Sequence, residues 1–205
     1  MTQHQRSPLF RDDWEYVEKS ALEDFRADDW QRLNTQRATY VAEEQARQAL
    51  RLLSTSAGDT TFGYQINNYR HGLQSATMIM EAGFDEETIV VALFHDVGFT
   101  VCPDAHGAFA AELLGAYISE ANGWMLRHHG AFQLYHCHEY PGIDSHARDR
   151  WRDHPHFQWT AEFVEKYDQN AIRSDYRERS LDVFEPMVQR LFARSPHPVG
   201  QEHKK

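Results

Sequence analysis

Histidine and aspartate recur through the middle of this chain on segments whose other residues are largely apolar. Six of them form an ordered series, each on or beside a segment expected to be helical: His71, His95, Asp96, His106, His129 and Asp168. Imidazole and carboxylate ligands suit iron, manganese or zinc, and six ligands are enough for two ions. The series therefore predicts a metal centre.

Each of these residues taken singly has a simpler interpretation. A lone His-Asp pair in a helix carries little information, and a single His71 would more often be a hydrogen-bonded histidine of the core. The apolar segment EETIVVALFHD, however, has no structural need for a His-Asp pair at its buried end. Burial of an unpaired carboxylate is costly, and metal coordination is one usual relief. The whole series therefore favours ligands over core histidines.

Hydrophobic periodicity predicts that helices position these side chains. The expected helical segments are 35–54, 69–83, 86–96, 103–119, 121–136, 158–172 and 181–194, with a helix or an ordered arm over 13–33. Gly83 is a candidate C-cap, and Asp85 is a candidate N-cap for the segment that ends in His95 and Asp96. That segment is apolar nearly all round, so its helix should be central and buried. With no convincing strand, the predicted architecture is an all-α domain of about eight helices.

Composition excludes several classes of protein. The chain has 205 residues, two cysteines (Cys102 and Cys137) without a CxxC motif, and a formal net charge of −10. The charge argues against nucleic acid as a partner, and the cysteines argue against a disulfide framework or a thiolate zinc site. No run reaches 18 apolar residues, and no secretory signal is visible, so we expect a cytoplasmic protein without a membrane span.

The segment NNYRHGLQSATMIMEAGFDEETIVVALFHDVGF resembles the core of the HD-domain superfamily. Within it, the chain most resembles the mixed-valent di-iron oxygenases, including those that cleave hydroxyphosphonates, and more distantly the myo-inositol oxygenases. HGAFAAELL and LRHHGAFQLYH resemble the segments that present the third and fourth histidines, and EKYDQ the one that presents the last aspartate. The resemblance covers about residues 62–170. It implies an HD-domain helical bundle over 56–195, a helical extension over 1–55 and a polar tail over 196–205.

The resemblance also implies how two iron ions, Fe(II) and Fe(III), would be held. One iron would take His71, His95 and Asp168, with Asp96 bridging to the second iron. The second iron would take His106 and His129 and share Asp96, which leaves open positions for substrate and O₂.

The function that follows from the resemblance is an oxygenase that uses O₂ to cleave a C–P bond. Its substrate would be a 1-hydroxy-2-(amino or trimethylammonio)ethylphosphonate, and its products phosphate and glycine or glycine betaine. One alternative is a metal-dependent phosphohydrolase that acts on a nucleotide or phosphomonoester through a metal-activated water. A second alternative is a non-catalytic HD module that binds a ligand.

Residues that would bind an anionic substrate are less clearly marked. Gln133 stands where the related phosphonate enzymes have a lysine, and Phe99 where they can have a histidine. Arg148, Arg150 and Arg152 are candidate anion clamps, because guanidinium binds phosphonate in a bidentate way. The alternative for these arginines is a solvated face shared with neighbouring aspartates.

Aromatic residues could recognise the rest of the substrate. Tyr64 is the candidate for a tyrosine that occupies the open iron position until substrate displaces it. Tyr135, Tyr140 and Trp124, with the aromatic residues around Tyr64, could surround a quaternary ammonium group. Loop packing and core packing are the simpler interpretations. Three further histidines are candidates for supporting contacts or for the surface: His128, His136 and His138.

Overall fold

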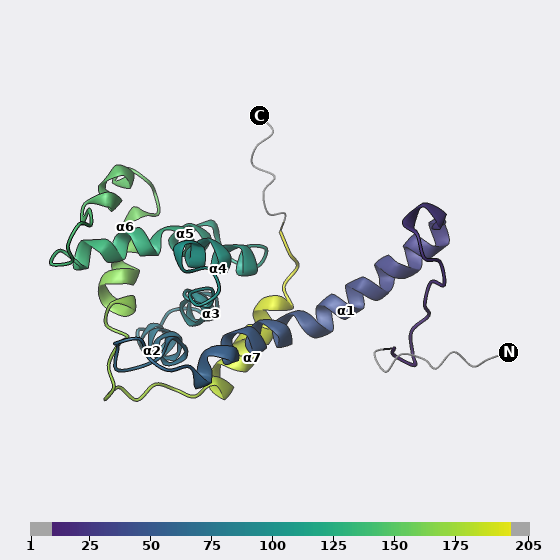
Figure 1. Ribbon diagram of the computed structural model, residues 1–205, viewed down its shortest axis with the longest axis horizontal. Helices are drawn as coiled ribbons and strands as arrows, with labels where there is room; N and C mark the ends of the chain where they lie inside the picture. The colour runs from purple at the N-terminus through teal and green to yellow at the C-terminus, as the bar shows by residue number, and fades with distance from the viewer. Residues whose placement is uncertain (1–9, 198–205) are drawn as a thin grey trace. The chain divides into compact units, whose positions relative to one another are not determined.

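The computed structural model describes residues 10–197, and within them it contains only helices, turns and loops. Seven α-helices follow one another (Figure 1): α1 (Ala27–Ser54), α2 (Asn68–Glu81), α3 (Glu86–Phe94), α4 (His106–Leu114), α5 (Glu120–Gln133), α6 (Phe157–Phe163) and α7 (Leu181–Phe192). The prediction of an all-α chain is confirmed. His4, His203 and the predicted tail from residue 198 onward lie outside the described residues.

Short helical turns connect several of these helices. Five are 3₁₀ turns: η1 (Leu22–Asp24), η2 (Thr55–Gly58), η3 (Pro103–Ala105), η4 (Leu134–His136) and η5 (Ala147–Trp151). One is a π-helical turn, η6 (Val164–Asp168), which directly continues α6. No helix among residues 10–197 combines the length and the apolar character that crossing a membrane would require.

The chain divides into two compact units, residues 1–45 and 46–205, and α1 continues from one into the other. In the first unit, the described residues before α1 form an ordered arm. The buried carboxylate of Asp29 accepts a hydrogen bond from the Arg26 backbone N–H at 2.9 Å and pairs with Lys19. Arg11 Nη1 lies 2.7 Å from Glu43 Oε2 on α1. Polar contacts and aromatic contacts, such as Trp14 with Tyr40 on α1, therefore hold this arm.

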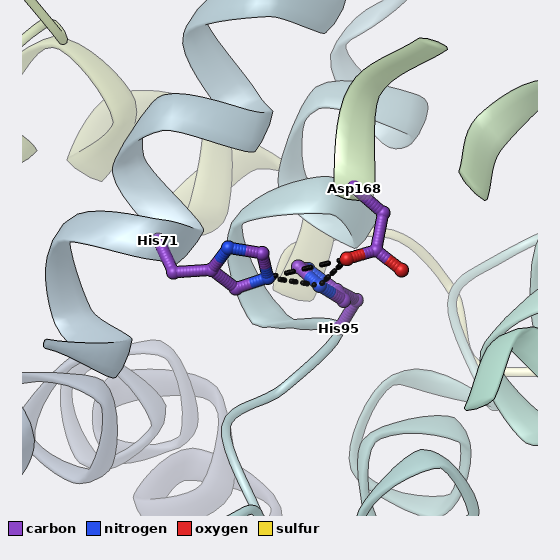
Figure 2. A group of neighbouring side chains, drawn as sticks. All are labelled: His71, His95 and Asp168. Carbon is purple, nitrogen blue, oxygen red and sulfur yellow. Dashed lines mark hydrogen bonds and ion pairs between the residues drawn. The ribbon is translucent and has the colours of Figure 1, made fainter. Parts of the chain in front are cut away.

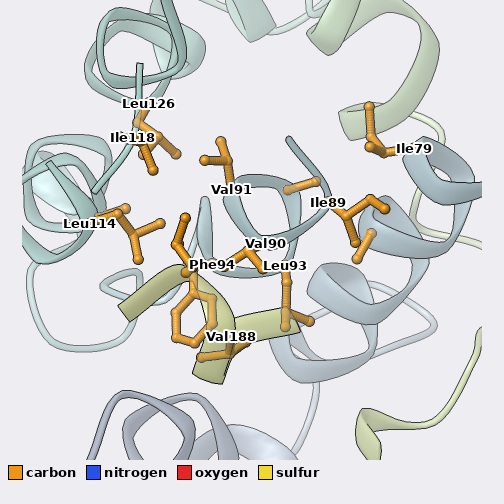
Figure 3. Packing of buried hydrophobic residues seen from close by; sticks show 14 of the residues in the cluster. Ile79, Ile89, Val90, Val91, Leu93, Phe94, Leu114, Ile118, Leu126 and Val188 are labelled. Carbon is orange, nitrogen blue, oxygen red and sulfur yellow. The ribbon is translucent and has the colours of Figure 1, made fainter. Parts of the chain in front are cut away.

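The second unit is built around α3. Asp85 caps this helix by accepting a hydrogen bond from Thr88 N at 2.9 Å, as predicted. Every residue from Thr88 to Phe94 is buried, and the helix packs against α2, α5 and α7 (Figure 3). The prediction of a central, buried helix is confirmed. Consequently the residues that follow Phe94, which are His95 and Asp96, leave the helix in the interior of the unit.

Two glycines allow neighbouring helices to approach closely. A Cβ added at Gly72 on α2 would lie 2.7 Å from Leu93 O on α3, nearer than a Cβ ordinarily comes to a backbone oxygen. A Cβ added at Gly107 on α4 would overlap Leu126 O on α5. Each glycine directly follows a histidine of the predicted series. Close helix contact at these points therefore brings His71 and His106 toward their neighbours.

Helix ends differ from the sequence prediction in several segments. The helix expected over 35–54 begins earlier, because α1 starts at Ala27, within the segment expected as a helix or an ordered arm. The expected helix over 103–119 is a 3₁₀ turn followed by α4, so His106 is the first residue of an α-helix. The expected helix over 158–172 is α6 followed by the π-helical turn, which ends at Asp168. Gly83 has a positive φ of 83° after α2, which confirms the predicted C-cap.

Alanine substitutions at these glycines test the close helix contacts. We expect Gly72→Ala and Gly107→Ala each to lower the free energy of unfolding by about 1–3 kcal/mol, because backbone on both sides must move apart. Gly123→Ala on α5 is the matched control, since its Cβ would meet only Ile118 Cδ1 at 4.0 Å. That control should be neutral or stabilising by up to about 1 kcal/mol. Urea denaturation of the three variants measures the difference, and equal effects would contradict this account of the packing.

Candidate metal centre

The four histidines of the series share one hydrogen-bonding arrangement. Each Nδ1 lies within hydrogen-bond distance of a backbone carbonyl oxygen: Ala171 O for His71 (3.0 Å), Ala92 O for His95 (2.7 Å), Pro103 O for His106 (2.6 Å) and Leu126 O for His129 (2.8 Å). A carbonyl only accepts, so each Nδ1 must carry the proton and donate it. The neutral imidazole then presents a lone pair at Nε2, the form in which histidine binds metals.

The first group of donors combines two of these nitrogens with a carboxylate. His71 Nε2 from α2 and His95 Nε2 from the end of α3 lie 2.9 Å apart (Figure 2). Asp168 Oδ1 lies 3.3 Å from the former and 3.5 Å from the latter. Two ligands of one ion with bonds of about 2.1 Å lie about 3.0–3.4 Å apart. The spacing therefore matches a shared metal ion.

The second group lies on α4 and α5. His106 Nε2 and His129 Nε2 are 3.1 Å apart, and Asp96 Oδ1 lies 3.3 Å from the first and 3.1 Å from the second. His129 is fully buried and His106 is partly exposed. These three donors leave coordination positions that protein atoms do not fill, as in catalytic metal sites.

Asp96 lies between the two groups. Its Oδ2 is 3.6 Å from His71 Nε2 in the first group, while its Oδ1 faces the second group. The triads His71–His95–Asp168 and His95–Asp96–His129 are buried, and each could hold a metal ion. The structure thus brings all six residues of the predicted series together, with the Asp96 carboxylate near the histidine nitrogens of both groups.

The two buried carboxylates of this centre, Asp96 and Asp168, need positive charge close to them. Burial by itself would raise the pKa of Asp96 and of Asp168. His95, His129 and His71 lower the pKa of Asp96, and His71 and His95 lower that of Asp168. Burial likewise would lower the pKa of His71, yet Asp168 and Asp96 raise it to about 9. Asp96 and Asp168 also raise the pKa of His129, so protons on His71 and His129 can supply this positive charge, and a bound ion would replace them.

Two helix ends add to the preference for cations. Asp96 follows the C-terminus of α3, and Asp168 is the last residue of the π-helical turn η6. Carbonyl groups at helix C-termini carry partial negative charge, so a carboxylate there is unfavourable unless a cation is close. Single π-helical turns are also frequent at functional sites.

A cavity of about 330 Å³ opens onto this centre. Four of the six residues line it: His71, Asp96, His106 and Asp168. Phe62, Tyr64 and Phe99 form part of its aromatic wall, where Phe62 and Phe99 stack with ring centres 5.5 Å apart. A cavity of this size suits a small molecule.

The predicted substrate residues separate into two sets. Tyr64 and Gln133 line the cavity, and Gln133 Nε2 donates to both carboxylate oxygens of Asp168 at 3.0 and 2.8 Å. Tyr135, Arg148 and Arg150 are not among the lining residues. Gln133 therefore orients a member of the centre, a role that the sequence did not suggest.

Stacking accounts for where the arginines and tyrosine lie instead. The Arg148 guanidinium lies 3.4 Å from the centre of the Tyr135 ring, and Arg150 lies 3.8 Å from that of Trp151. Arg152 pairs with Asp149 at 2.9 Å, which is the solvated alternative. None of these three arginines faces the cavity as a clamp.

The predicted aromatic cage around a cation is also not assembled from the expected residues. Trp124 packs outside the cavity wall, with its ring stacked on His154 at 4.2 Å, and Tyr140 is exposed. Only the loop aromatics Phe62 and Tyr64, with Phe99, line the cavity. Trp124 is held away from the cavity because its ring packs against His128 and His154.

Contacts that support the centre were not visible in the sequence. Asn68 Nδ2 donates to Asp96 O at 2.8 Å and fixes the turn after α3. The carbonyl of Ala171 accepts the proton of His71 Nδ1, although 100 residues separate the two. His136 and Cys137 line the cavity as well. The sequence named His136 as a candidate for a supporting contact, but only tertiary contacts bring Asn68, Ala171 and Cys137 to the site.

A scan against protein-family models found none that matches this chain, and a search of curated proteins found no match.

Replacement of Asp96 tests whether one carboxylate serves both groups. We expect Asp96→Ala to weaken binding of the first and the second metal ion by more than about 100-fold, above the 10–100-fold typical of outer-shell changes. Metal analysis after dialysis gives the stoichiometry, which should be about two in the native protein if six ligands hold two ions. Asp104→Ala, an exposed aspartate near His106, is the control. An unchanged metal content in Asp96→Ala would contradict the assignment.

Replacement of Gln133 tests its contact with Asp168. Gln133→Leu keeps the side-chain size but removes both hydrogen bonds, so the carboxylate should lose its orientation. We expect metal affinity to fall by about 10–100-fold, measured by competition with a chelator. Gln189→Leu at an exposed position on α7 is the control. Identical affinities in the two variants would show that Gln133 does not position Asp168.

Proposed function

We propose that this chain is a dinuclear metal enzyme of the HD-domain type, with two iron ions in mixed-valent form. Its activity is oxygenation of a small hydroxylated phosphonate with cleavage of the C–P bond. The amino- or trimethylammonio-substituted 1-hydroxyethylphosphonates are the substrate class, with O₂ as co-substrate.

The position of Asp96 between two pairs of facing histidine nitrogens carries this proposal. His71 and His95 on one side, and His106 and His129 on the other, present Nε2 atoms 2.9 and 3.1 Å apart. A single-ion site would not need the second pair. Ligands of nitrogen and oxygen without thiolate suit iron in an oxygenase.

The protein's own part in the reaction is to place and shield the reacting groups. Asp168, held by Gln133, and Asp96, held through Asn68, would keep the ligands in place. Iron, when bound, supplies the redox chemistry with O₂ and polarises a coordinated substrate oxygen. Phe62 and Phe99 line the cavity and would limit the water that reaches the substrate.

The cavity wall offers contacts to the ammonium end of such a substrate. Tyr64, Phe62 and Phe99 offer ring faces or edges to an ammonium group, in place of the more distant aromatics. No lysine or arginine is among the residues that line the cavity. An anionic substrate group would therefore depend on the metal ions and on a polar residue of the wall.

Oxygen dependence tests the proposal. The iron-loaded protein should consume O₂ and release phosphate with 1-hydroxy-2-aminoethylphosphonate or its trimethylammonio form, and release none under nitrogen. Phosphate released from phosphomonoesters without oxygen would instead identify a metal-dependent phosphohydrolase. Substrate binding without turnover in either condition would identify a non-catalytic module. An EPR spectrum of the partly oxidised protein reports directly on coupled Fe(II)/Fe(III).

A further inference from the structure

The side-chain amides that line the cavity already donate hydrogen bonds to other groups of the protein. Asn67 Nδ2 donates to the backbone of Ser56, Ala57 and Asp59, and Asn68 Nδ2 donates to Asp96 O. The Gln133 amide serves Asp168, and Gln169 Nε2 donates to Glu165 O. These amide donors are therefore committed before any ligand enters.

His136 differs from these amides. It lies at the end of η4, lines the cavity, and its Nε2 is shielded from solvent without a hydrogen-bond partner. Apart from the residues of the metal centre, it is the only lining residue that can carry a positive charge. A shielded ring nitrogen without a partner is unfavourable in the empty protein, and a ligand atom could satisfy it.

Arg148 brings positive charge beside His136. Elements η4 and η5 are in contact, and no carboxylate of the described residues lies within ion-pair distance of the Arg148 guanidinium. Arg148 Nε is likewise shielded and without a partner. Burial and the charge of Arg148 lower the pKa of His136, while Glu165 and Asp168 on η6 act in the opposite direction. His136 therefore has unused hydrogen-bonding capacity at the cavity wall, and Arg148 adds positive charge from outside the lining residues.

We propose that His136, with Arg148 beside it, forms the oxyanion subsite of the cavity and binds the phosphonate or phosphate group of the substrate. This inference rests on the proposed function for the identity of the substrate, but not for the anion chemistry. The imidazole donates a hydrogen bond to an oxygen of the anion, and the guanidinium adds long-range attraction. The sequence analysis gave the binding of the anion to arginines alone, whereas this inference gives it to His136 together with Arg148.

Phosphate binding to the full-length, metal-loaded protein under nitrogen tests the subsite. We expect His136→Leu to weaken the binding of inorganic phosphate by about 10–100-fold, as expected for loss of a hydrogen bond to a charged group. His138→Leu is the matched control, because His138 lies on the same loop, is exposed and does not line the cavity. Azide, which is small enough to reach the metal ions alone, should bind equally to all variants.

A second variant guards against a folding defect at His136. Arg148→Met keeps apolar contact with the Tyr135 ring but removes the charge, and should weaken phosphate binding by about three- to tenfold, the smaller effect expected of a charge acting without direct contact. Equal phosphate affinity in native protein and His136→Leu would overturn the inference, as would equal weakening by His138→Leu.

Failure of the proposed function is separable from these outcomes. A protein that takes up no O₂ but loses phosphate affinity on His136→Leu retains the subsite and loses the oxygenase assignment. If the chain holds no metal, the His136 ring resonances of the metal-free protein are followed by NMR as phosphate is added. A shift of these resonances then supports the subsite, and unchanged resonances overturn it.

Discussion

The interior of the second unit depends on positive charge between facing imidazole nitrogens and two buried carboxylates. Backbone carbonyls hold the Nδ1 protons of four histidines, so the Nε2 lone pairs of each pair point toward one another at 2.9 and 3.1 Å. Lone pairs at that separation repel unless a proton or a metal ion lies between them. Asp96 and Asp168 also require a nearby positive charge, because a buried carboxylate without a counter-charge is strongly unfavourable.

The helical bundle can be understood as the framework that fixes this arrangement. The apolar helix α3 delivers His95 and Asp96 to the interior and is itself buried on all sides. Gly72 and Gly107 let α2 and α4 approach the helices that carry the partner histidines. Because each carbonyl that orients an imidazole belongs to a helix or to a turn beside one, ligand geometry and helix packing stabilise one another. A substitution that alters the helix packing would therefore also move the ligand atoms, and the reverse holds as well.

The residues that would recognise a substrate differ in burial and bonding from those that would bind metal. Metal ligands are buried and their positions are set by packing, whereas the cavity wall is mostly aromatic or already hydrogen-bonded. Arg148 and Arg150 are positively charged, but they lie outside the cavity lining and stack on Tyr135 and Trp151. This leaves His136 to meet an anion directly. Recognition would then rely on the metal ions for most of the charge and on few side chains for orientation.

Local patterns were enough to predict the helices and the residues that could bind metal. Periodicity and capping located α3 and its Asp85 cap, and the polar residues within apolar segments singled out the six candidates, because such placements are costly without a partner. Long-range packing alone placed Gln133 on Asp168, Asn68 on Asp96 and His136 in the cavity wall. It also turned the arginines of η5 onto aromatic rings, since a sequence does not record which face of a short turn meets its neighbours. Spacing along the chain shows which groups need partners, whereas the packed helices decide which partners they find.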